Sequence, residues 1–305
     1  MRCGFIGLGH IGKFLAGSLL RNGFEVTVYD LNVDAAAPLV AKGAKLAGSI
    51  KELCDASDTV FTCLPSPRAI DAVVAGAGGV IESLAGRATR ATWIDMSTND
   101  QDETLRLGAM CEAKGINALE SPVTGGVHKA AHGDITVLVG GEQDVYKAHE
   151  KALNAMGQPV LYIGKLGSAA VIKVITNMLA FIHLVAAGEA LMLAKRGGLD
   201  LGIAFEAIKQ SSGNSFVHET ESQVILNGSY NINFTMDLAL KDLGFAMEYG
   251  NEFGVPLDLA GHTYQTFIRA KAAYGGDAWS SQVVKLLEDA TNTDLRAPGF
   301  PAELE

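Results

Sequence analysis

Apolar and polar positions change their spacing twice within residues 1–30. A short apolar run over residues 3–6 gives way to helical spacing after Gly12, and a second apolar run covers residues 25–29 before Asp30. Short apolar runs bounded by glycines are typical of strands, and recurrence at every third or fourth position is typical of helices. The pattern therefore predicts strand, helix and strand, which together form one βαβ unit.

Five more short apolar runs alternate with helical stretches between residues 58 and 163. These runs cover residues 58–64, 92–96, 117–120, 135–139 and 160–163. Strands separated by helices form a doubly wound parallel sheet with helices on both faces. We therefore predict an α/β, Rossmann-type domain over residues 1–164. Its ligands should lie beyond the carboxyl ends of the strands.

The strand pattern stops at Gly167, and the rest of the chain has helical spacing interrupted by glycine pairs. The first of these helices is long and is predicted to run from Ser168 to Arg196 between the domains. We expect residues 165–305 to form an all-α domain for substrate binding and oligomerisation. The final stretch, from Asn292 to Glu305, has two prolines and little periodicity, and is expected to be a surface arm or a frayed end.

The composition limits the classes of function. A chain of 305 residues with 48% hydrophobic residues can form two domains with sizeable cores. The formal net charge of -10 disfavours a nucleic-acid binder, which needs clustered lysine and arginine. The apolar stretch of the long helix is interrupted by Lys173, Asn177, His183 and Glu189, so it predicts a buried helix and no membrane span.

The four cysteines suggest neither disulfides nor a metal site. Cys3, Cys54, Cys63 and Cys111 have no paired spacing, which favours buried thiols in a reducing compartment. The glycine-rich motif starts so close to the first residue that no signal peptide is expected before it. We therefore expect a cytoplasmic protein without metal.

The turn between the first strand and helix has the spacing of a dinucleotide-binding loop. Gly7 suits the tight turn, Gly9 allows a pyrophosphate to approach the backbone, and Gly12 lets helix and strand pack closely. The helix N-terminus favours an anion. Asp30, at the end of the second strand, can accept hydrogen bonds from an adenine-ribose diol. NAD is therefore the predicted cofactor.

The long helix carries two polar side chains in its apolar stretch. Lys173 and Asn177 are four residues apart, so they lie on one face of the helix. Burial lowers the pKa of a lysine toward the range that suits general acid/base catalysis. The alternative is a lysine whose ammonium group reaches solvent from the start of the helix.

Several separated motifs resemble the β-hydroxyacid dehydrogenases, the group that includes 3-hydroxyisobutyrate dehydrogenase and tartronate semialdehyde reductase. The resemblance covers nearly the whole chain. Besides the opening glycine motif, it rests on Leu64-Pro65, Asp95-Met96-Ser97-Thr98, Ser121-Pro122-Val123-Thr124-Gly125-Gly126, Gly164-Lys165-Leu166-Gly167 with Lys173-Val174-Ile175-Thr176-Asn177, and Leu240-Lys241-Asp242-Leu243.

The resemblance implies a role for each matched residue. Lys173 would be the catalytic general acid/base, and Asn177 would orient the substrate. The residues expected to bind the substrate acid are Ser121, Thr124, Gly125, Gly126 and Lys241. The residues expected to contact the cofactor are Gly7, Gly9, His10, Ile11, Gly12, Asp30, Leu31, Leu64, Pro65, Ser97, Thr98 and Lys241.

Some positions depart from the family pattern. Thr124 stands where the family usually has serine, and Glu120-Ser121 where it usually has an Asp-Ala pair. His128 and Lys129 follow the glycines, where many relatives have small residues. They could bind a second anionic group of the substrate, or form a solvated surface loop.

The sequence thus predicts an NAD-dependent 3-hydroxyacid dehydrogenase that acts on a small carboxylic acid and forms a homodimer or homotetramer. Two alternatives remain. An imine reductase shares the fold but typically lacks the lysine, and a non-catalytic relative would use the fold only to bind a cofactor or partner. The motifs do not distinguish among β-hydroxy acids or give the physiological direction.

Overall fold

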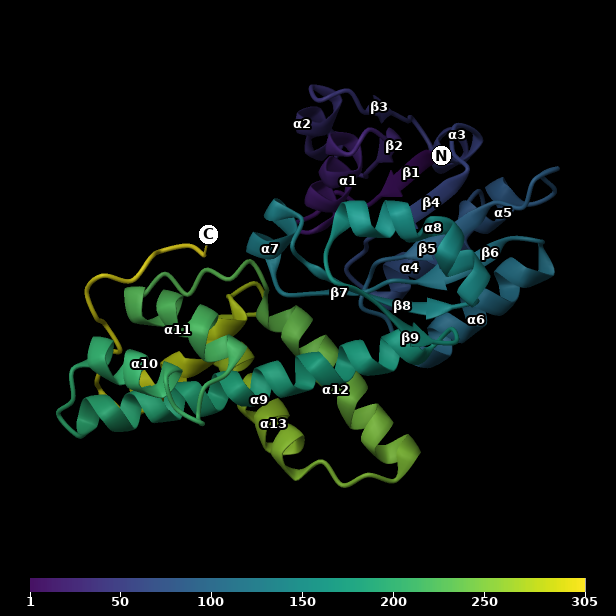
Figure 1. The fold of residues 1–305 in the computed structure, drawn as a ribbon. Helices are drawn as coiled ribbons and strands as arrows, with labels where there is room; N and C mark the ends of the chain where they lie inside the picture. Colours follow the sequence, from purple (N-terminus) through teal and green to yellow (C-terminus); the bar gives the residue numbers. More distant parts are fainter. Residues whose placement is uncertain (305) are drawn as a thin grey trace. The chain divides into compact units, whose positions relative to one another are not determined.

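The computed structural model describes residues 1–304, which form two compact units (Figure 1). The first unit is Met1–Lys173, and the second begins at Val174. The helix α9 (Ser168–Arg196) belongs to both units, because the boundary falls after Lys173, within this helix. Sequence analysis placed the domain boundary at residue 164, before this helix.

Within residues 1–304 one sheet of nine strands forms the centre of the first unit. The strands are β1 (Arg2–Ile6), β2 (Glu25–Tyr29), β3 (Lys45–Leu46), β4 (Thr59–Thr62), β5 (Thr92–Asp95), β6 (Asn117–Glu120), β7 (Val123–Thr124), β8 (Thr136–Gly141) and β9 (Val160–Gly164). Their order is β3-β2-β1-β4-β5-β6-β8-β7, with β9 paired to β8. The order reverses between β1 and β4, which is where doubly wound sheets bind dinucleotides.

Every apolar run that predicted a strand forms one, and the predicted Rossmann-type fold is confirmed. Two features of the sheet were not predicted. The strands β3 and β7 have only two residues each, too few to show a periodic pattern. The strand β8 runs antiparallel to both β6 and β7, so the sheet is mixed. The connection from β7 to β8 is too short for the crossover that parallel strands require.

Helices cover both faces of this sheet (Figure 1). One face is covered by α1 (Gly12–Arg21), α7 (Val127–His132) and α8 (Gln143–Met156), whose apolar side chains pack with β1 and β2. The other face is covered by α3 (Ile50–Asp55), α4 (Pro67–Val74), α5 (Val80–Leu84) and α6 (Gln101–Ala113). The short helices η1 (Val33–Ala36) and α2 (Ala37–Val40) follow β2.

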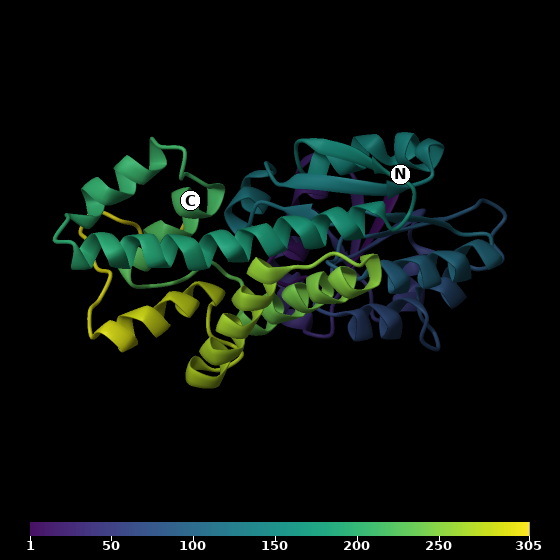
Figure 2. The ribbon, with the colours of Figure 1, turned by 90° about the horizontal axis from the view of Figure 1, so that it is seen from below.

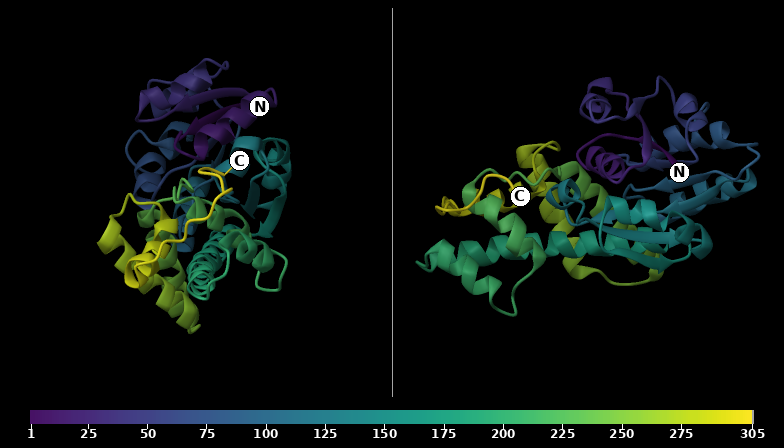
Figure 3. Two further views of the ribbon diagram at one scale, coloured as in Figure 1. Left: turned by 90° about the vertical axis from the view of Figure 1, so that its left-hand side faces the viewer. Right: turned by 45° about the horizontal axis from the view of Figure 1, so that its top comes forward.

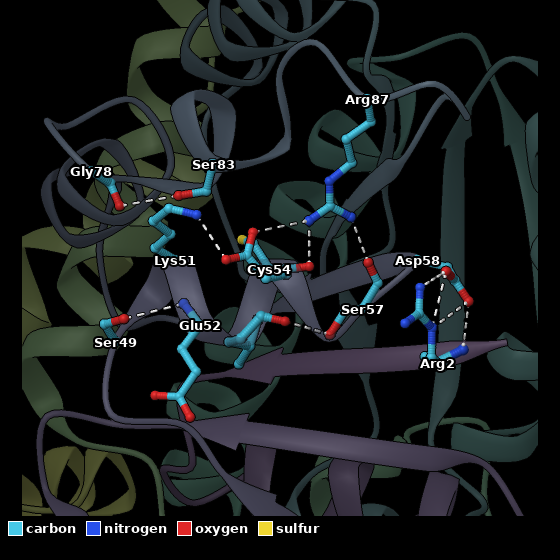
Figure 4. Close-up of polar contacts among 12 residues, drawn as sticks. Arg2, Ser49, Lys51, Glu52, Cys54, Ser57, Asp58, Gly78, Ser83 and Arg87 are labelled. Carbon is cyan, nitrogen blue, oxygen red and sulfur yellow. Dashed lines mark hydrogen bonds and ion pairs between the residues drawn. The ribbon is translucent and has the colours of Figure 1, made fainter.

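Charged side chains close the edge of the sheet at the amino ends of β1 and β4 (Figure 4). Arg2 forms an ion pair with Asp58 at 2.6 Å. The guanidinium of Arg87 donates to the carbonyl oxygens of Cys54 and Ser57, near the end of α3. Arg87 thus provides a partner for one carbonyl group of the last turn of α3. The carboxyl ends of the strands lie at the other end of the sheet.

The second unit is all helical, as predicted. It contains most of α9 together with α10 (Leu201–Lys209), α11 (Phe216–Asn227), α12 (Met236–Phe253), α13 (Asp258–Tyr274), η2 (Ser280–Val284) and α14 (Lys285–Thr291). Its core packs large apolar side chains of α9, α12 and α13, including Phe181, Leu243 and Phe267. Figure 2 shows the length of α9, whose observed bounds are those predicted from the sequence.

The helix α9 is also the one helix in residues 1–304 whose length and composition would allow it to cross a membrane. Its most apolar window has a mean hydropathy of 1.9. A core helix of a soluble protein can have the same length and composition. Both Lys173 and Asn177 lie within α9 and are buried, consistent with a core helix.

The segment after α14, residues 292–304, lies mostly on the surface, as one of the two expectations had it, but it is anchored to the second unit and is not a frayed end. Leu295 is fully buried, and its backbone N–H donates to the buried Glu288 at 2.8 Å. The backbone N–H of Ala297 donates to the carbonyl oxygen of Leu226 at 3.0 Å. Figure 3 shows this segment in yellow beside the green helices of the same unit. These contacts depend on distant residues, so local periodicity did not reveal them.

Candidate active site

The three glycines of the first loop have different surroundings. Gly7 has a φ of +94°, and a Cβ on it would lie 2.3 Å from the carbonyl oxygen of Cys63. A Cβ on Gly12 would lie 2.0 Å from the carbonyl oxygen of Gly7. A Cβ on Gly9 would meet no atom within 4 Å, so the backbone there is open to a ligand. The loop thus has the tight turn, the close packing and the open backbone that a pyrophosphate site requires.

Asp30 is fixed against this loop. Its Oδ2 accepts a hydrogen bond from the backbone N–H of Leu8 at 2.6 Å, and its Oδ1 accepts one from Asn32 at 2.8 Å. Each carboxylate oxygen keeps a further lone pair for a ribose hydroxyl. Leu31 is 90% exposed, which provides an apolar surface next to the carboxylate. These residues therefore fit the adenosine half of NAD.

A buried carboxylate organises the carboxyl ends of β4 and β5. Asp95 accepts hydrogen bonds from the hydroxyl of Thr62 at 2.9 Å and from that of Ser97 at 2.6 Å. The Oγ of Ser97 in turn accepts from the backbone N–H of Leu64 at 2.8 Å. The hydroxyl of Ser97 thus holds the Leu64-Pro65 loop in place. Sequence analysis assigned Ser97 to the cofactor, but gave Asp95 no role of its own.

A second buried carboxylate connects β6 to the start of α9. Glu120 accepts hydrogen bonds from the backbone N–H groups of Ala169 at 2.9 Å and Ala170 at 2.8 Å. Burial raises the pKa of Glu120 to about 7, and the backbone hydrogen bonds partly oppose this shift. A Cβ on Gly140 would lie 2.2 Å from Oε1 of Glu120, so a glycine there gives the carboxylate room. Glu120 therefore fixes the turn of α9 that precedes Lys173.

The predicted carboxylate-binding residues follow β6 directly. Thr124 ends β7 and pairs with Thr136 of β8. Gly125 and Gly126 have φ values of +128° and +91°, which favour glycine. Ser121 is fully buried, and its hydroxyl has no hydrogen-bond partner among residues 1–304. The first unit thus holds these four residues in one continuous segment.

The two polar residues of α9 are both buried, with Lys173 7% exposed and Asn177 9% exposed. They are one helical turn apart, and the boundary between the compact units falls between them. The apolar stretch around Lys173 makes a charged ammonium costly there unless it is paired or used. A buried lysine of this kind is a candidate for general acid/base catalysis.

Asp242 brings Asn177 and Lys241 together within the second unit. The Nδ2 of Asn177 donates to Oδ2 of Asp242 at 2.6 Å, and the ammonium of Lys241 lies 2.7 Å from Oδ1. Asp242 is only 1% exposed, and Lys241 also lies 5.0 Å from the ring centroid of Phe245. Sequence analysis named Lys241 and missed Asp242, although the adjacent acid within an apolar helix was a visible signal.

Other predicted positions are also placed by the structure. His10 is exposed and Ile11 is half-buried at the start of α1. In the loops after β4 and β5, Pro65 is exposed and Thr98 is half-buried. Among residues 1–304, no group of three or more His, Cys, Asp and Glu side chains could hold a metal ion.

The reversed strand order, the open glycine loop and the fixed acid after β2 define the first unit as a dinucleotide-binding domain of an oxidoreductase type. The model of the NAD binding domain of 6-phosphogluconate dehydrogenase matches residues 2–164. The model of the NAD-binding domain of NADP-dependent 3-hydroxyisobutyrate dehydrogenase matches residues 167–287. The chain belongs to the β-hydroxyacid dehydrogenase family. The predicted family and the predicted cofactor, NAD, are both confirmed.

The similarity to known proteins extends over nearly the whole chain. It is 33% identical to 2-(hydroxymethyl)glutarate dehydrogenase from Eubacterium barkeri, over 97% of each chain. A structure of 3-hydroxyisobutyrate dehydrogenase from Salmonella typhimurium has a TM-score of 0.85 at 29% identity, covering 94% of this chain and 99% of that one. An imine reductase from Pseudomonas sp. is 20% identical with a TM-score of 0.62, over 94% and 99% of the two chains, and shows the fold alone.

Proposed function

We propose that the protein interconverts a small β-hydroxy acid and its semialdehyde, with NAD as the hydride carrier. The observation that carries this proposal is the buried Lys173, one turn before Asn177, in a chain of the β-hydroxyacid dehydrogenase family. The names of the relatives support a hydroxy acid as the substrate class.

Lys173 is the general acid/base of this proposal. When bound, NAD accepts or supplies the hydride. During oxidation the neutral amine of Lys173 takes the proton of the substrate hydroxyl, and during reduction its ammonium returns that proton.

Other residues of the chain orient the acid. Asn177 donates to or accepts from the reacting oxygen, while Asp242 holds its amide in one orientation. The hydroxyl of Thr124 and the backbone N–H groups of Gly125 and Gly126 bind the substrate carboxylate. Lys241, which pairs with Asp242 in the second unit, is assigned to the substrate acid and the cofactor in this proposal. Holding the acid in one pose favours the reaction because less orientational entropy is lost at the barrier.

The first test is replacement of the lysine. Lys173→Met should lower kcat by about two to four powers of ten, because proton transfer is lost. NADH binding, followed by its fluorescence, should stay close to that of the unchanged protein. Lys114→Met, at an exposed lysine after α6, is the control and should keep full activity.

The substrates for this test are 3-hydroxyisobutyrate, threonate and 2-(hydroxymethyl)glutarate, each with NAD. A nearly normal kcat in the Lys173→Met variant would contradict the proposed mechanism. Reduction of a cyclic imine without oxidation of any hydroxy acid would favour an imine reductase. Cofactor binding without either activity would favour a non-catalytic protein.

We also propose that the protein is a cytoplasmic homodimer or homotetramer. Several large apolar side chains of the second unit are mostly exposed, including Leu193 at 77%, Ile203 at 72% and Leu259 at 71%. Exposed apolar surface of this kind is typical of subunit interfaces. A molar mass of one chain in solution, measured by light scattering, would contradict the oligomer.

A further inference from the structure

Two basic side chains lie against the glycines of the proposed carboxylate-binding loop. A Cβ on Gly126 would lie 3.0 Å from Cε1 and 3.1 Å from Nδ1 of His128. A Cβ on Gly125 would lie 3.0 Å from Cδ of Lys129. Both side chains start in the first turn of α7 and fold back along the loop. They therefore flank the atoms that would hold the substrate carboxylate.

His128 has two other basic residues as neighbours, Lys129 and His132. His132 lies on the same short helix, with its Nδ1 2.9 Å from the carbonyl oxygen of His128. Burial and the charges of Lys129 and His132 lower the pKa of His128. At neutral pH the ring of His128 is thus a neutral hydrogen-bond donor, while Lys129 supplies the positive charge. The side chains of His128 and Lys129 are half-buried. Salt and solvent therefore screen an ion pair there less than at a fully exposed position.

On the basis of the function proposed above, we propose that His128 and Lys129 bind a second carboxylate, so that the preferred substrate is a β-hydroxy dicarboxylic acid. One carboxylate of this acid lies on the Thr124–Gly126 loop. The other extends from the same carbon on a short methylene chain to Lys129, with a hydrogen bond from His128. A carboxylate is the natural partner of an ammonium next to a ring N–H, because both donors then contact acceptor oxygens.

Three acids with the same reacting end test this inference. 3-Hydroxyisobutyrate carries a methyl group on its central carbon, 2-(hydroxymethyl)pentanoate carries an uncharged propyl chain, and 2-(hydroxymethyl)glutarate carries a chain that ends in a carboxylate. In the unchanged protein, kcat/KM for the diacid should exceed that for the pentanoate at least about tenfold, the value of one hydrogen bond to a charged group.

Lys129→Met keeps the length of the side chain and removes its charge. It should lower kcat/KM for the diacid at least about tenfold and leave the two monoacids within about twofold. Lys129→Arg should restore most of the activity on the diacid, and His128→Leu should cause a smaller loss, again specific to the diacid. Lys147→Met, at an exposed lysine of α8, is the matched control and should change none of the three.

The outcomes separate this inference from the proposed function. Two results would overturn the second carboxylate site and leave the proposed dehydrogenase activity unaffected. One is an equal kcat/KM for the diacid and the pentanoate, and the other is a loss in Lys129→Met that is the same for all three acids. No oxidation of any of the three acids by the unchanged protein with NAD would overturn both. A diacid-specific loss that arginine restores supports the inference.

Discussion

Asp242 joins two side chains that have separate tasks in the proposed reaction. It accepts a hydrogen bond from Asn177 and pairs with Lys241, and it is almost completely buried. A buried carboxylate with two such partners fixes both of them, because each would otherwise lose a hydrogen bond to a charged group.

Asp242→Asn should therefore impair catalysis. The new amide can accept from one partner only, and its own N–H₂ group faces another donor. We expect kcat/KM to fall about tenfold to a hundredfold, corresponding to roughly 1.5–3 kcal/mol, with a rise in KM as well as a fall in kcat. Steady-state kinetics with 3-hydroxyisobutyrate and NAD measure both parameters.

Asp237→Asn on the same helix is the control for this variant. Asp237 pairs with Lys271, but both side chains are about half exposed, and such surface pairs contribute little. Its kinetics should remain unchanged. Unaltered kinetics in Asp242→Asn, or equal losses in both variants, would show that Asp242 does not hold the catalytic groups.

The choice of cofactor also depends on single residues. Asp30 places a carboxylate where the 2′ position of the ribose is expected, and Leu31 adds no positive charge. A 2′-phosphate would be repelled there, so NAD should be preferred over NADP by at least about tenfold in kcat/KM. Asp30→Asn combined with Leu31→Arg should shift the preference toward NADP.

Asp30 also accepts a hydrogen bond from the backbone N–H of Leu8. The double variant weakens this hydrogen bond, so part of its loss of activity with NAD will reflect a change in the glycine loop. The measurement is kcat/KM for both cofactors at saturating acid. The order of preference among acids serves as the internal control and should not change. Equal use of NADP by the unchanged protein would show that another residue distinguishes the ribose.

At the scale of elements, the start of α9 depends on a carboxylate from β6. Glu120 is 3% exposed, and its pKa is raised from 4.5 to about 7, chiefly by burial. The folded protein therefore binds this proton more tightly than the unfolded chain. The stability that this group contributes is fully present below its unfolded pKa and is lost as the pH rises from about 4.5 to about 7.

Glu120→Gln removes this titration and keeps an oxygen that can accept from the backbone. Between pH 5 and pH 8, the unfolding free energy of the unchanged protein should fall relative to that of the variant by on the order of 2–3 kcal/mol. Urea unfolding at several pH values measures the difference. Parallel pH curves for the two proteins would show that Glu120 does not titrate in this range.

The elements themselves could largely be predicted from the sequence. The strands β1, β2, β4, β5, β6, β8 and β9 and the full length of α9 follow from apolar spacing. The two-residue strand β7 and the direction of β8 did not, because they depend on how a short connection folds back on the sheet. The anchored segment around Leu295 was missed for a similar reason, since its partners Glu288 and Leu226 are set by tertiary packing.

At the scale of the whole molecule, the candidate site could be predicted only where its residues form local motifs. The glycine loop and the Lys173–Asn177 pair were visible as spacing. The carboxylates Asp95, Glu120 and Asp242 were present in the motifs but had no assigned partner, because their contacts join elements far apart in the sequence. Sequence patterns thus indicated the groups expected to react, and the structure added the groups that hold them.

The helix α9 passes from one compact unit into the other between Lys173 and Asn177. Each residue of an α-helix turns the chain by about 100° and advances it by about 1.5 Å. One inserted or deleted residue between these two positions would therefore turn the side chain of Asn177 to a different face of α9, whereas a substitution keeps the spacing. If both side chains act in the proposed reaction, related dehydrogenases should differ in the lengths of their surface loops but keep the four-residue spacing from Lys173 to Asn177.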